Sequence, residues 1–351
     1  MQTGSTSSPS DSAAAGSPRR VSRRDIARAA GVSLATVTYA LSDQPKIRVS
    51  VAQRAKIRRL AREMNYRPNF IGRALVSGKT FAVGIVLPTP NAIAIYFYHQ
   101  IIQHLVTAMI PDEYHLMILF RSELDHVLRI IREGRLDGII NLQSDLETVH
   151  LDRLAATRLP LVSLNRGYKP PRGAGPVGIV ESDHAGLMRS VLDEFQAERC
   201  RSLLGVFGNP RIYANTIMLH AYRAELAARA PAGLQGVEAT VVAVDPNPDF
   251  QPLGILEKSI DGIFVDGLET AERLIEWTAQ QGLRVGRDYQ LITSEFFSGA
   301  RSRSQLERCC YLQQPELLGP AAWQTLKAEL NGEKCPKPVL IPYLRVPVRD
   351  L

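Results

Sequence analysis

The sequence predicts a small all-helical region at the N-terminus, followed by a larger α/β body with two lobes. Three short helix patterns with capping residues precede residue 66, and from Phe81 onward short apolar runs alternate with amphipathic helical stretches. The charge divides at the same place: residues 1–80 hold 15 lysines and arginines against 4 acidic residues, and the rest of the chain holds 27 against 31. A basic head on a mildly acidic body favours a nucleic-acid-binding head, although a membrane-surface segment would also be basic.

Length and composition exclude several classes of protein. With 351 residues the chain has room for two or three domains, and 45% hydrophobic against 22% charged residues is the balance of a folded protein with a sizeable core. Residues 1–20 are small and polar and lack an apolar signal core, so we expect a disordered tail. The longest uncharged stretch, Phe81–Tyr98, is broken by two prolines and an asparagine, which predicts a strand, a loop and a helix start but no membrane span.

The four cysteines show no zinc-binding pattern. Cys309 and Cys310 are adjacent, Cys200 and Cys335 stand alone, and no pair has the CxxC spacing. We therefore expect buried thiols in a reducing cytoplasm and no metal site.

The first two helix patterns form a pair. Ser22 is followed three residues later by Asp25, the spacing of a capping box, and the helix that begins there ends at Gly31, where a left-handed turn is needed. Ser33 caps a second helix that runs to about Leu41. A helix, a tight glycine turn and a second helix, with small alanines where the two approach, predict a helix-turn-helix.

A third helix begins at Ser50, with Gln53 at the capping-box spacing, and runs to about Asn65. Its expected apolar stripe is Ala55, Leu60, Ala61 and Met64. The opposite face carries five cations: Arg54, Lys56, Arg58, Arg59 and Arg62.

Two segments, RDIARAAGVSLATVTYALS and VSVAQRAKIRRLAREMNYRPNFIGRALVSGKT, resemble the DNA-binding headpiece of the LacI/GalR (lactose-repressor) family. The resemblance covers residues 21–80. It is specific, because a generic helix-turn-helix is not followed by NYRPN and a short amphipathic segment at this distance. It implies a helix-turn-helix DNA-binding domain at residues 21–67, and a hinge helix and linker at residues 68–80.

The resemblance also implies which residues touch DNA. The second helix would enter the major groove, where Leu34, Ala35 and Tyr39 occupy the family's base-reading positions. Leu34 and Ala35 can make only apolar contacts, such as those with thymine methyl groups, and Tyr39 replaces the arginine that is common in the family. Three hydroxyl groups are placed to bond phosphates or, alternatively, to act only as caps or back-bonded helix residues: those of Ser33, Thr36 and Thr38.

The segment Asn69–Val76 matches the family's hinge helix. A single short helix is marginal in water and Gly72 weakens this one further, so we expect it to order with DNA and a second subunit. Leu75 matches the leucine that wedges between central base pairs and kinks the duplex, with packing in its own domain as the alternative. Asn69 and Arg73 are further expected DNA contacts.

Strands and helices alternate through the body, which predicts parallel sheets with helices on both faces. The first expected strands are Ala82–Leu87, Leu116–Phe120, Gly138–Leu142, Leu161–Leu164 and Val177–Val180. A second set is Leu203–Phe207, Val237–Val244, Gly262–Val265 and Gln290–Thr293, with a final strand at Val339–Val346. The segments RLDGII (135–140) and SIDGIF (259–264) repeat an Asp-Gly turn before a buried strand, which supports two similar lobes.

The resemblance implies a periplasmic-binding-protein-like core over residues 81–351, with an effector cleft between its two lobes. The first lobe would hold residues of about 81–182 and 313–343, and the second would hold about 183–312 and 344–351. The C-terminus has no leucine heptad, so we expect a homodimer and no tetramer.

Eight residues match cleft positions of the family, with ordinary packing inside a lobe as the open alternative: Tyr96, Phe97, Asn165, Arg166, Met218, Phe250, Asp266 and Glu295. Met218 stands where the family commonly has an arginine that clamps the effector. This change, together with the loss of one acidic group, predicts a small-molecule effector that is less polar than a sugar or differently charged, or else weakened effector control.

No enzymatic pattern is present. GAGPVG at residues 173–178 has the GxGxxG spacing, but it follows a proline-rich loop and precedes a strand, so we expect a loop that binds no dinucleotide. The HExxH, P-loop and GxSxG patterns are absent, and the histidines are scattered. We expect no cofactor, no metal site and no catalytic activity.

These expectations combine in a bacterial, cytoplasmic and nucleoid-associated transcriptional regulator, a repressor that binds a palindromic double-stranded DNA operator as a homodimer. An effector of unknown identity in the cleft would shift the lobes and change how readily the hinge helices pair. Two other classes stay open. One is a DNA-binding regulator whose core no longer binds an effector. The other is a solute-binding transport protein, which would need a signal peptide and would not carry the basic head.

Overall fold

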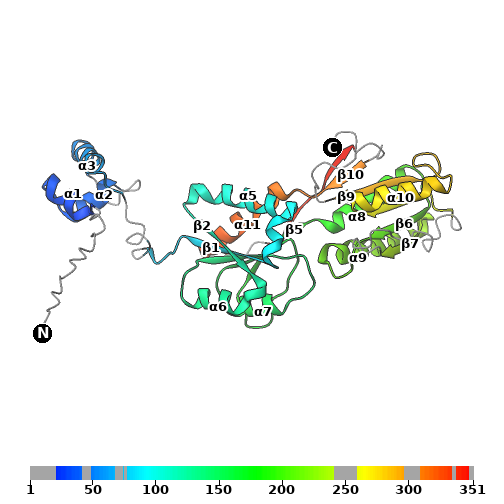
Figure 1. Cartoon of the computed structure of the whole chain (residues 1–351), viewed down its shortest axis with the longest axis horizontal. Helices are drawn as coiled ribbons and strands as arrows, with labels where there is room; N and C mark the ends of the chain where they lie inside the picture. The colour runs from blue at the N-terminus through cyan, green and yellow to red at the C-terminus, as the bar shows by residue number, and fades with distance from the viewer. Residues whose placement is uncertain are drawn as a thin grey trace, which may run out of the picture. The chain divides into compact units, whose positions relative to one another are not determined.

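The computed structural model describes residues 21–41, 49–67, 74, 77–240, 259–295, 309–333 and 337–347. The chain forms two compact units, Met1–Lys79 and Thr80–Leu351, called here the headpiece and the core. Figure 1 shows the helices of the headpiece and the two lobes of the core. None of the described helices is both long and apolar enough to cross a bilayer.

The headpiece packs three helices around a small apolar centre: α1 (Arg23–Ala30), α2 (Leu34–Leu41) and α3 (Val51–Glu63). Ile26, Val37 and Ile57 are fully buried there, one from each helix. The expected stripe on α3 is wrong at one position, because Ala55 is exposed and Ile57 takes its place. Ile57 lies four residues before Ala61, on the same face of the helix, whereas Ala55 lies two residues before Ile57 and points away.

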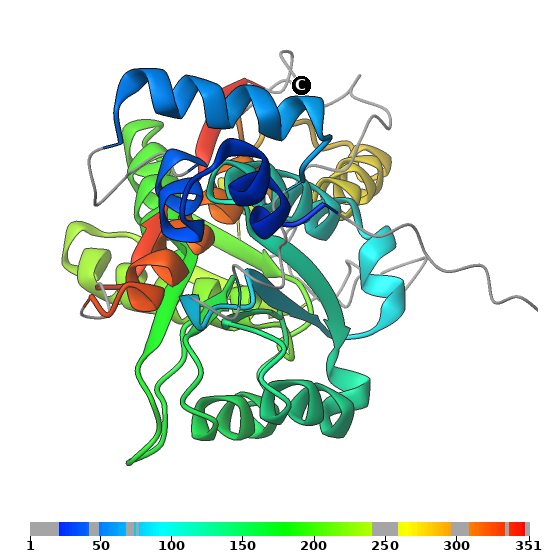
Figure 2. The same cartoon turned by 90° about the vertical axis from the view of Figure 1, so that its left-hand side faces the viewer.

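The first lobe holds a six-stranded sheet in the order β11-β5-β4-β3-β1-β2, and all of its neighbouring strands are parallel. Its strands are β1 (Ala82–Leu87), β2 (His115–Phe120), β3 (Gly138–Leu142), β4 (Leu161–Leu164), β5 (Val177–Ser182) and β11 (Val339–Ile341). Its helices are α5 (Tyr96–Met109), α6 (Leu124–Arg132), α7 (Val149–Ala156) and α11 (Pro315–Leu330). Helices α5 and α11 cover one face of the sheet, and α6 and α7 lie side by side on the other (Figures 1 and 2).

The second lobe repeats this plan with the order β12-β10-β9-β8-β6-β7, in which only β12 runs antiparallel to its neighbour. Its strands are β6 (Ser202–Phe207), β7 (Gln235–Thr240), β8 (Gly262–Asp266), β9 (Gln290–Glu295), β10 (Cys309–Leu312) and β12 (Leu344–Pro347). Helices α8 (His184–Ala197) and α9 (Tyr213–Arg229) cover one face, and α10 (Leu268–Gln280) covers the other. The described 3-10 helices are η1 (Pro90–Ala94), η2 (Ile110–Asp112), η3 (Arg121–Glu123) and η4 (Ala230–Ala232).

The chain crosses between the lobes three times: from β5 to α8, from β10 to α11, and from β11 to β12. The expected single strand Val339–Val346 is therefore wrong. Pro342 and Tyr343 separate two strands that belong to different sheets. Strand β10 has no counterpart among the expected strands, and the part of Val237–Val244 after Thr240 lies outside the described residues. The GAGPVG segment is a loop up to Val177, as expected.

The repeated Asp-Gly segments occupy matching positions in the two sheets. Before β3, the Asp137 carboxylate accepts hydrogen bonds from the backbone N–H groups of Thr80 (2.7 Å) and Phe81 (2.9 Å) at the start of β1. Before β8, Asp261 does the same for the N–H groups of Arg201 (2.9 Å) and Ser202 (2.8 Å) at the start of β6. Each aspartate thus satisfies backbone donors at the edge of its sheet and fixes the start of the central strand.

Replacing Asp261 with alanine leaves these backbone donors without their acceptor. We expect a loss of stability of about 2 kcal/mol, the cost of unsatisfied partly buried groups. The control is Glu133→Ala, which removes an exposed ion pair with Arg135 at 3.6 Å and should cost less than about 0.5 kcal/mol. Urea unfolding followed by circular dichroism measures both, and equal shifts would contradict the role of Asp261.

Candidate nucleic-acid interface and interlobe cleft

Helix α1 is capped at both of its ends, and its C-cap begins the turn to α2. Ser22 and Asp25 form the predicted capping box: the Ser22 N–H donates to Asp25 Oδ2 (2.8 Å), and the Asp25 N–H donates to Ser22 Oγ. Gly31 ends α1 with φ of 69°, a left-handed conformation that glycine adopts without strain. The chain therefore turns tightly and begins α2 directly after Ser33.

The N-terminal turn of α2 presents apolar side chains to solvent. Leu34 is 43% exposed, and Ala35 is exposed next to it. Val37 and Ala40 of the same helix are fully buried, so the exposed pair lies on the face away from the headpiece core. An exposed leucine at the start of a helix-turn-helix second helix is suited to contact with thymine methyl groups. Tyr39 is half-buried.

The three hydroxyls of α2 have partners within the helix. Ser33 Oγ accepts from the Thr36 N–H (3.1 Å) and lies 2.9 Å from Thr36 Oγ1, while Thr38 Oγ1 donates to the Leu34 carbonyl (2.9 Å). These are the capping and back-bonded roles that the sequence left open. Phosphate contacts by the same hydroxyls stay a prediction.

Two cations of α3 cap the other helices. Lys56 Nζ donates to the carbonyl of Ala30, the last residue of α1 (3.2 Å), and Arg58 Nε donates to the carbonyl of Ala40 near the end of α2 (3.3 Å). The carbonyl groups at a helix C-terminus are unsatisfied and carry partial negative charge, so cations stabilise them. The third helix thereby holds the helix-turn-helix pair in place.

Four predicted site residues lie outside the described residues: Asn69, Arg73, Leu75 and Phe250.

Asn165 and Arg166 follow β4, at the carboxyl edge of the first sheet. Asn165 has φ of 64°, and its N–H donates to the Val180 carbonyl of β5 (2.7 Å). Arg166 is buried, and its Nη1 donates to the carbonyls of Asp145 (2.8 Å) and Glu147 (3.0 Å). Burial lowers the pKa of Arg166, an effect that nearby Asp145 opposes.

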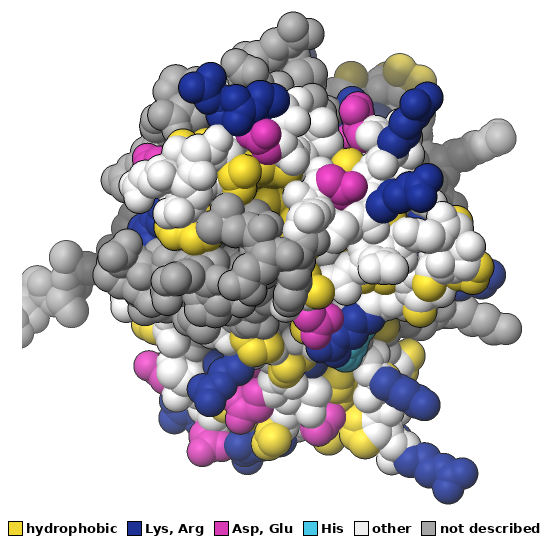
Figure 3. Space-filling view, turned by 90° about the vertical axis from the view of Figure 1, so that its right-hand side faces the viewer, with side chains coloured by type: hydrophobic (Ala, Val, Ile, Leu, Met, Phe, Trp, Pro, Cys, Tyr) yellow, Lys and Arg dark blue, Asp and Glu magenta, His cyan; other side chains and the backbone are white. Residues whose placement is uncertain are grey.

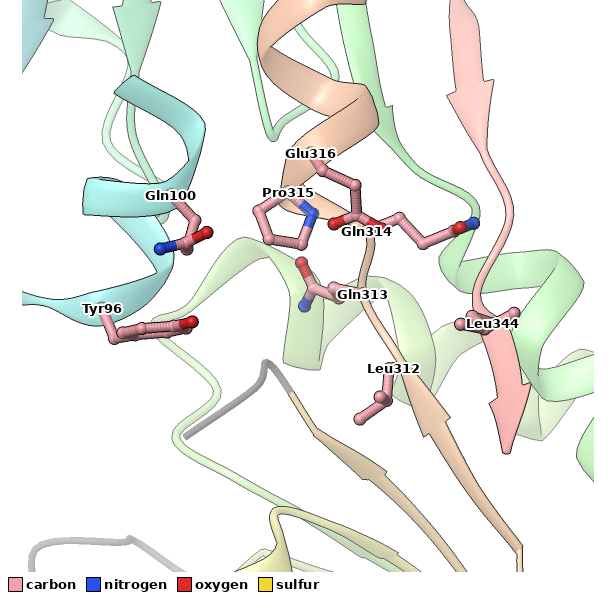
Figure 4. Close-up of a pocket in the computed structure, with 8 residues that line it drawn as sticks. All are labelled: Tyr96, Gln100, Leu312, Gln313, Gln314, Pro315, Glu316 and Leu344. Carbon is pink, nitrogen blue, oxygen red and sulfur yellow. The ribbon is translucent and has the colours of Figure 1, made fainter. Parts of the chain in front are cut away.

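Of the aromatic and methionine residues predicted at the effector site, two are buried in a lobe and one is exposed. Phe97 and Met218 are buried, Phe97 in the core of the first lobe and Met218, 1% exposed, in the core of the second. Tyr96 is 41% exposed and lines a pocket of about 220 Å³ with α5, the β10–α11 crossing and β12. Figure 4 shows Gln100 and Gln313 near Tyr96, while Gln314 points away toward β12.

Asp266 and Glu295 end neighbouring strands of the second sheet. Ser294 Oγ donates to Asp266 Oδ1 (2.7 Å), and the Leu268 N–H at the start of α10 donates to Glu295 Oε2 (2.8 Å). A carboxylate at a helix N-terminus is stabilised by unpaired N–H groups. Burial raises the pKa of Asp266 from its usual 3.8 to about 6, while the bond from Ser294 opposes this change.

The residue that the sequence analysis missed is Tyr213, the first residue of α9. Its N–H donates to the Ser144 carbonyl of the first lobe (2.6 Å), and the Arg166 guanidinium lies 5.4 Å from the centre of its ring. Burial raises the pKa of Tyr213 to about 12. The signal was available, because ligand sites of parallel sheets lie just beyond the carboxyl ends of the strands and Tyr213 follows β6.

On the face drawn in Figure 3, the described cations of the core do not gather into a basic patch. Figure 3 shows lysine and arginine side chains there standing singly among acidic and neutral ones. Several of these cations have acidic partners, among them Arg223 with Glu238 and Arg287 with Asp288. Within the described residues, the headpiece is therefore the better candidate for binding nucleic acid.

Comparison with known proteins points to the same region. Residues 24–69 match the family of bacterial regulatory proteins, lacI family. The HTH-type transcriptional regulator MalR of Streptococcus pneumoniae is 25% identical over 213 residues, 59% of this chain and 62% of MalR. The catabolite repressor/activator of Escherichia coli is 30% identical over 181 residues, 50% of this chain and 53% of that protein. The match thus spans about three fifths of the length of MalR and about half of the length of the catabolite repressor/activator. These relatives are regulators, in agreement with the expectation of a non-enzyme.

Solved structures share the fold. The lac repressor dimer bound to operator and the anti-inducer ONPF superimposes with a TM-score of 0.69 at 18% identity, covering 93% of this chain and 98% of that one. The transcriptional regulator CelR in complex with cellobiose gives a TM-score of 0.59 at 19% identity, over 93% and 98% of the two chains. The predicted fold class, a helix-turn-helix headpiece followed by a two-lobed periplasmic-binding-protein-like core, is confirmed.

The raised pKa of Asp266 predicts a pH dependence of stability. Between about pH 4 and pH 6 the folded protein keeps a proton that the unfolded chain has released, so stability is higher at low pH and falls as the pH rises toward 6. Asp266→Asn keeps an acceptor for Ser294 and removes the charge. The variant should therefore be more stable at pH 7 by up to ~3 kcal/mol and should have a higher melting temperature there. The decrease of stability between pH 4 and pH 6 should also be smaller than in the parent protein.

Thermal melts from pH 4 to pH 8 test this expectation. Asp193→Asn, which changes an exposed carboxylate paired with Arg229, serves as the control and should keep the slope of the parent protein. An Asp266→Asn profile that parallels the parent profile would remove Asp266 from the explanation.

Proposed function

We propose that this chain is a member of the lacI family of bacterial regulatory proteins and a cytoplasmic, sequence-specific DNA-binding transcriptional regulator. It acts as a repressor that binds a palindromic operator as a homodimer, under the control of a small-molecule effector in the interlobe cleft. One observation carries the proposal: α2 presents Leu34 and Ala35 to solvent at its N-terminus, within the segment that matches the family.

Geometry and charge support this assignment. A second helix held by α1 and α3 enters the major groove with its N-terminal residues, and here those residues are apolar. The basic charge of the first 80 residues supplies the nonspecific attraction to phosphates that DNA binding requires. The structure of the lac repressor named above, a dimer bound to operator, has the same fold and supports the homodimer.

A second candidate is a regulator whose core binds no effector. It is favoured by Met218, which is buried in the second lobe where the family commonly carries an effector-clamping arginine. The two candidates differ in one measurable property, the response of operator affinity to small molecules. A panel of metabolites added to the protein–operator complex separates them.

Selection from random-sequence DNA with the purified full chain, at near-physiological salt, tests the proposal. We expect a palindrome with a flexible central step, and half-sites that carry thymines opposite Leu34 and Ala35. In the same selection, Leu34→Asn should change the preferred base at one half-site position. Retention of DNA with no enriched sequence, fading steeply with salt, would contradict specific regulation.

Replacing Leu75 with alanine tests the hinge. If Leu75 is inserted between base pairs, the variant should lose at least about tenfold in affinity for the selected operator, with little change on nonspecific DNA. Leu60→Ala, a change at a partly buried headpiece position, is the control for general destabilisation. Equal losses of affinity on both DNAs would contradict the insertion of Leu75 between base pairs. Fluorescence anisotropy at fixed salt measures the affinities of the parent and both variants for each DNA.

A further inference from the structure

The two lobes of the core are joined by a contact far from the three chain crossings in sequence. The segment after β3 and the segment before α9 form an antiparallel bridge at Asp145 and Ile212. The Tyr213 N–H donates to the Ser144 carbonyl (2.6 Å), and the Leu146 N–H donates to the Arg211 carbonyl (3.2 Å). Each lobe thus contributes one donor and one acceptor.

The side chain of Tyr213 enters a socket, made of Arg166, Gly167 and Glu181 of the first lobe and His184 of α8. The guanidinium of Arg166 lies over its ring, 5.4 Å from the centre, and the centres of the Tyr213 and His184 rings lie 6.4 Å apart. Its hydroxyl lies beside the backbone of Gly167 and close to the Glu181 carboxylate. A Cβ atom at Gly167 would lie 2.4 Å from this hydroxyl, so only glycine leaves room for it.

The socket is rigid because its members are held by other bonds. Arg166 is fixed by the carbonyls of Asp145 and Glu147, and the Asp145 carboxylate is paired with Arg121 at 2.6 Å. The hydroxyls of Ser144 and Tyr98 lie 2.8 Å apart, which ties the same segment to α5. Tyr213 therefore meets preformed partners, and little side-chain entropy is lost on the socket side.

We propose that Tyr213 is a built-in latch that holds the two lobes together, and that its socket selects a ligand with a hydroxyl-bearing aromatic ring, which would take the place of the tyrosine. A flat ring satisfies the cation above it. A hydroxyl at the end of that ring lies close to the Glu181 carboxylate, whose buried Oε2 has no hydrogen-bond partner and so favours a ligand that can donate a hydrogen bond. The ligand class rests on the effector control proposed above. The latch does not, and it can be measured without DNA.

Hydrogen exchange of the full chain, followed by mass spectrometry, tests the latch. In Tyr213→Ala, peptides that cover residues 144–147 and 211–214 should exchange about tenfold faster, because the interlobe N–H groups lose their protection. Peptides from β6 and β8 should keep their parent rates. Tyr168→Phe, which removes a hydroxyl bonded to Asp152 within the first lobe, is the matched control and should change neither interlobe segment.

Chemical rescue tests the ligand class. Millimolar p-cresol, which reproduces the tyrosine side chain, should restore protection of both segments in Tyr213→Ala, and toluene, which lacks the hydroxyl, should restore much less. Rescue by both compounds alike, or by neither, would overturn the phenolic class.

A second variant keeps the latch testable if Tyr213→Ala unfolds. Gly167→Ala places a methyl group against the Tyr213 hydroxyl from the other lobe and leaves the tyrosine intact. It should speed exchange in the same two segments. Unchanged exchange in both variants would overturn the latch, whereas the DNA-binding proposal would be unaffected.

Discussion

Both sheets consist mainly of parallel strands, and this constraint places many of the polar residues at the boundary between the lobes. The carboxyl ends of parallel strands meet at one edge of a sheet, so the residues that follow the strands gather there. In the first lobe, Ser144 and Arg166 follow β3 and β4, and in the second lobe Glu295 ends β9 and Gln313 follows β10. Because the chain crosses between the lobes at the same edges, both sets lie at one boundary: Ser182 Oγ, at the end of β5, donates to Gln313 Oε1 (3.2 Å).

Burial at that boundary obliges each charged group to find a partner. The guanidinium of Arg166 uses backbone carbonyls, which cost no second charge, and Glu295 uses the N-terminus of α10. Asp266 has only the Ser294 hydroxyl as a described hydrogen-bond partner, and its pKa is raised accordingly. Tyr213 completes the set, because the Arg166 guanidinium of the opposite lobe lies over its ring, 5.4 Å from the centre. Complementary polar groups thus contribute to the contact between the lobes.

Local pattern sufficed for much of the fold. Helix starts at Ser22 and Ser50 follow from capping residues, and the buried strands follow from short β-branched runs. Pattern failed where the outcome depends on distant parts of the chain. The composition of Val339–Val346 predicts one strand, yet its first part is β11 of one sheet and its last part belongs to β12 of the other. The burial of Met218 depends on how α9 packs within the second lobe, and the contacts of Tyr213 depend on how the lobes meet. Periodicity within a single helix specifies neither.

Polar side chains of the headpiece likewise have partners within the protein. Lys56 and Arg58 stand on α3 in a basic row, but each already donates to the end of a neighbouring helix, and Arg59 lies 3.6 Å from Glu63. The hydroxyls of Ser33 and Thr38 likewise serve α2 itself. Counting cations in the sequence therefore overstates how many are committed to phosphates. In the DNA complex that we propose, apolar contacts from the start of α2 and the shape of the DNA would therefore carry most of the discrimination between sequences, since phosphate contacts fix register without reading bases.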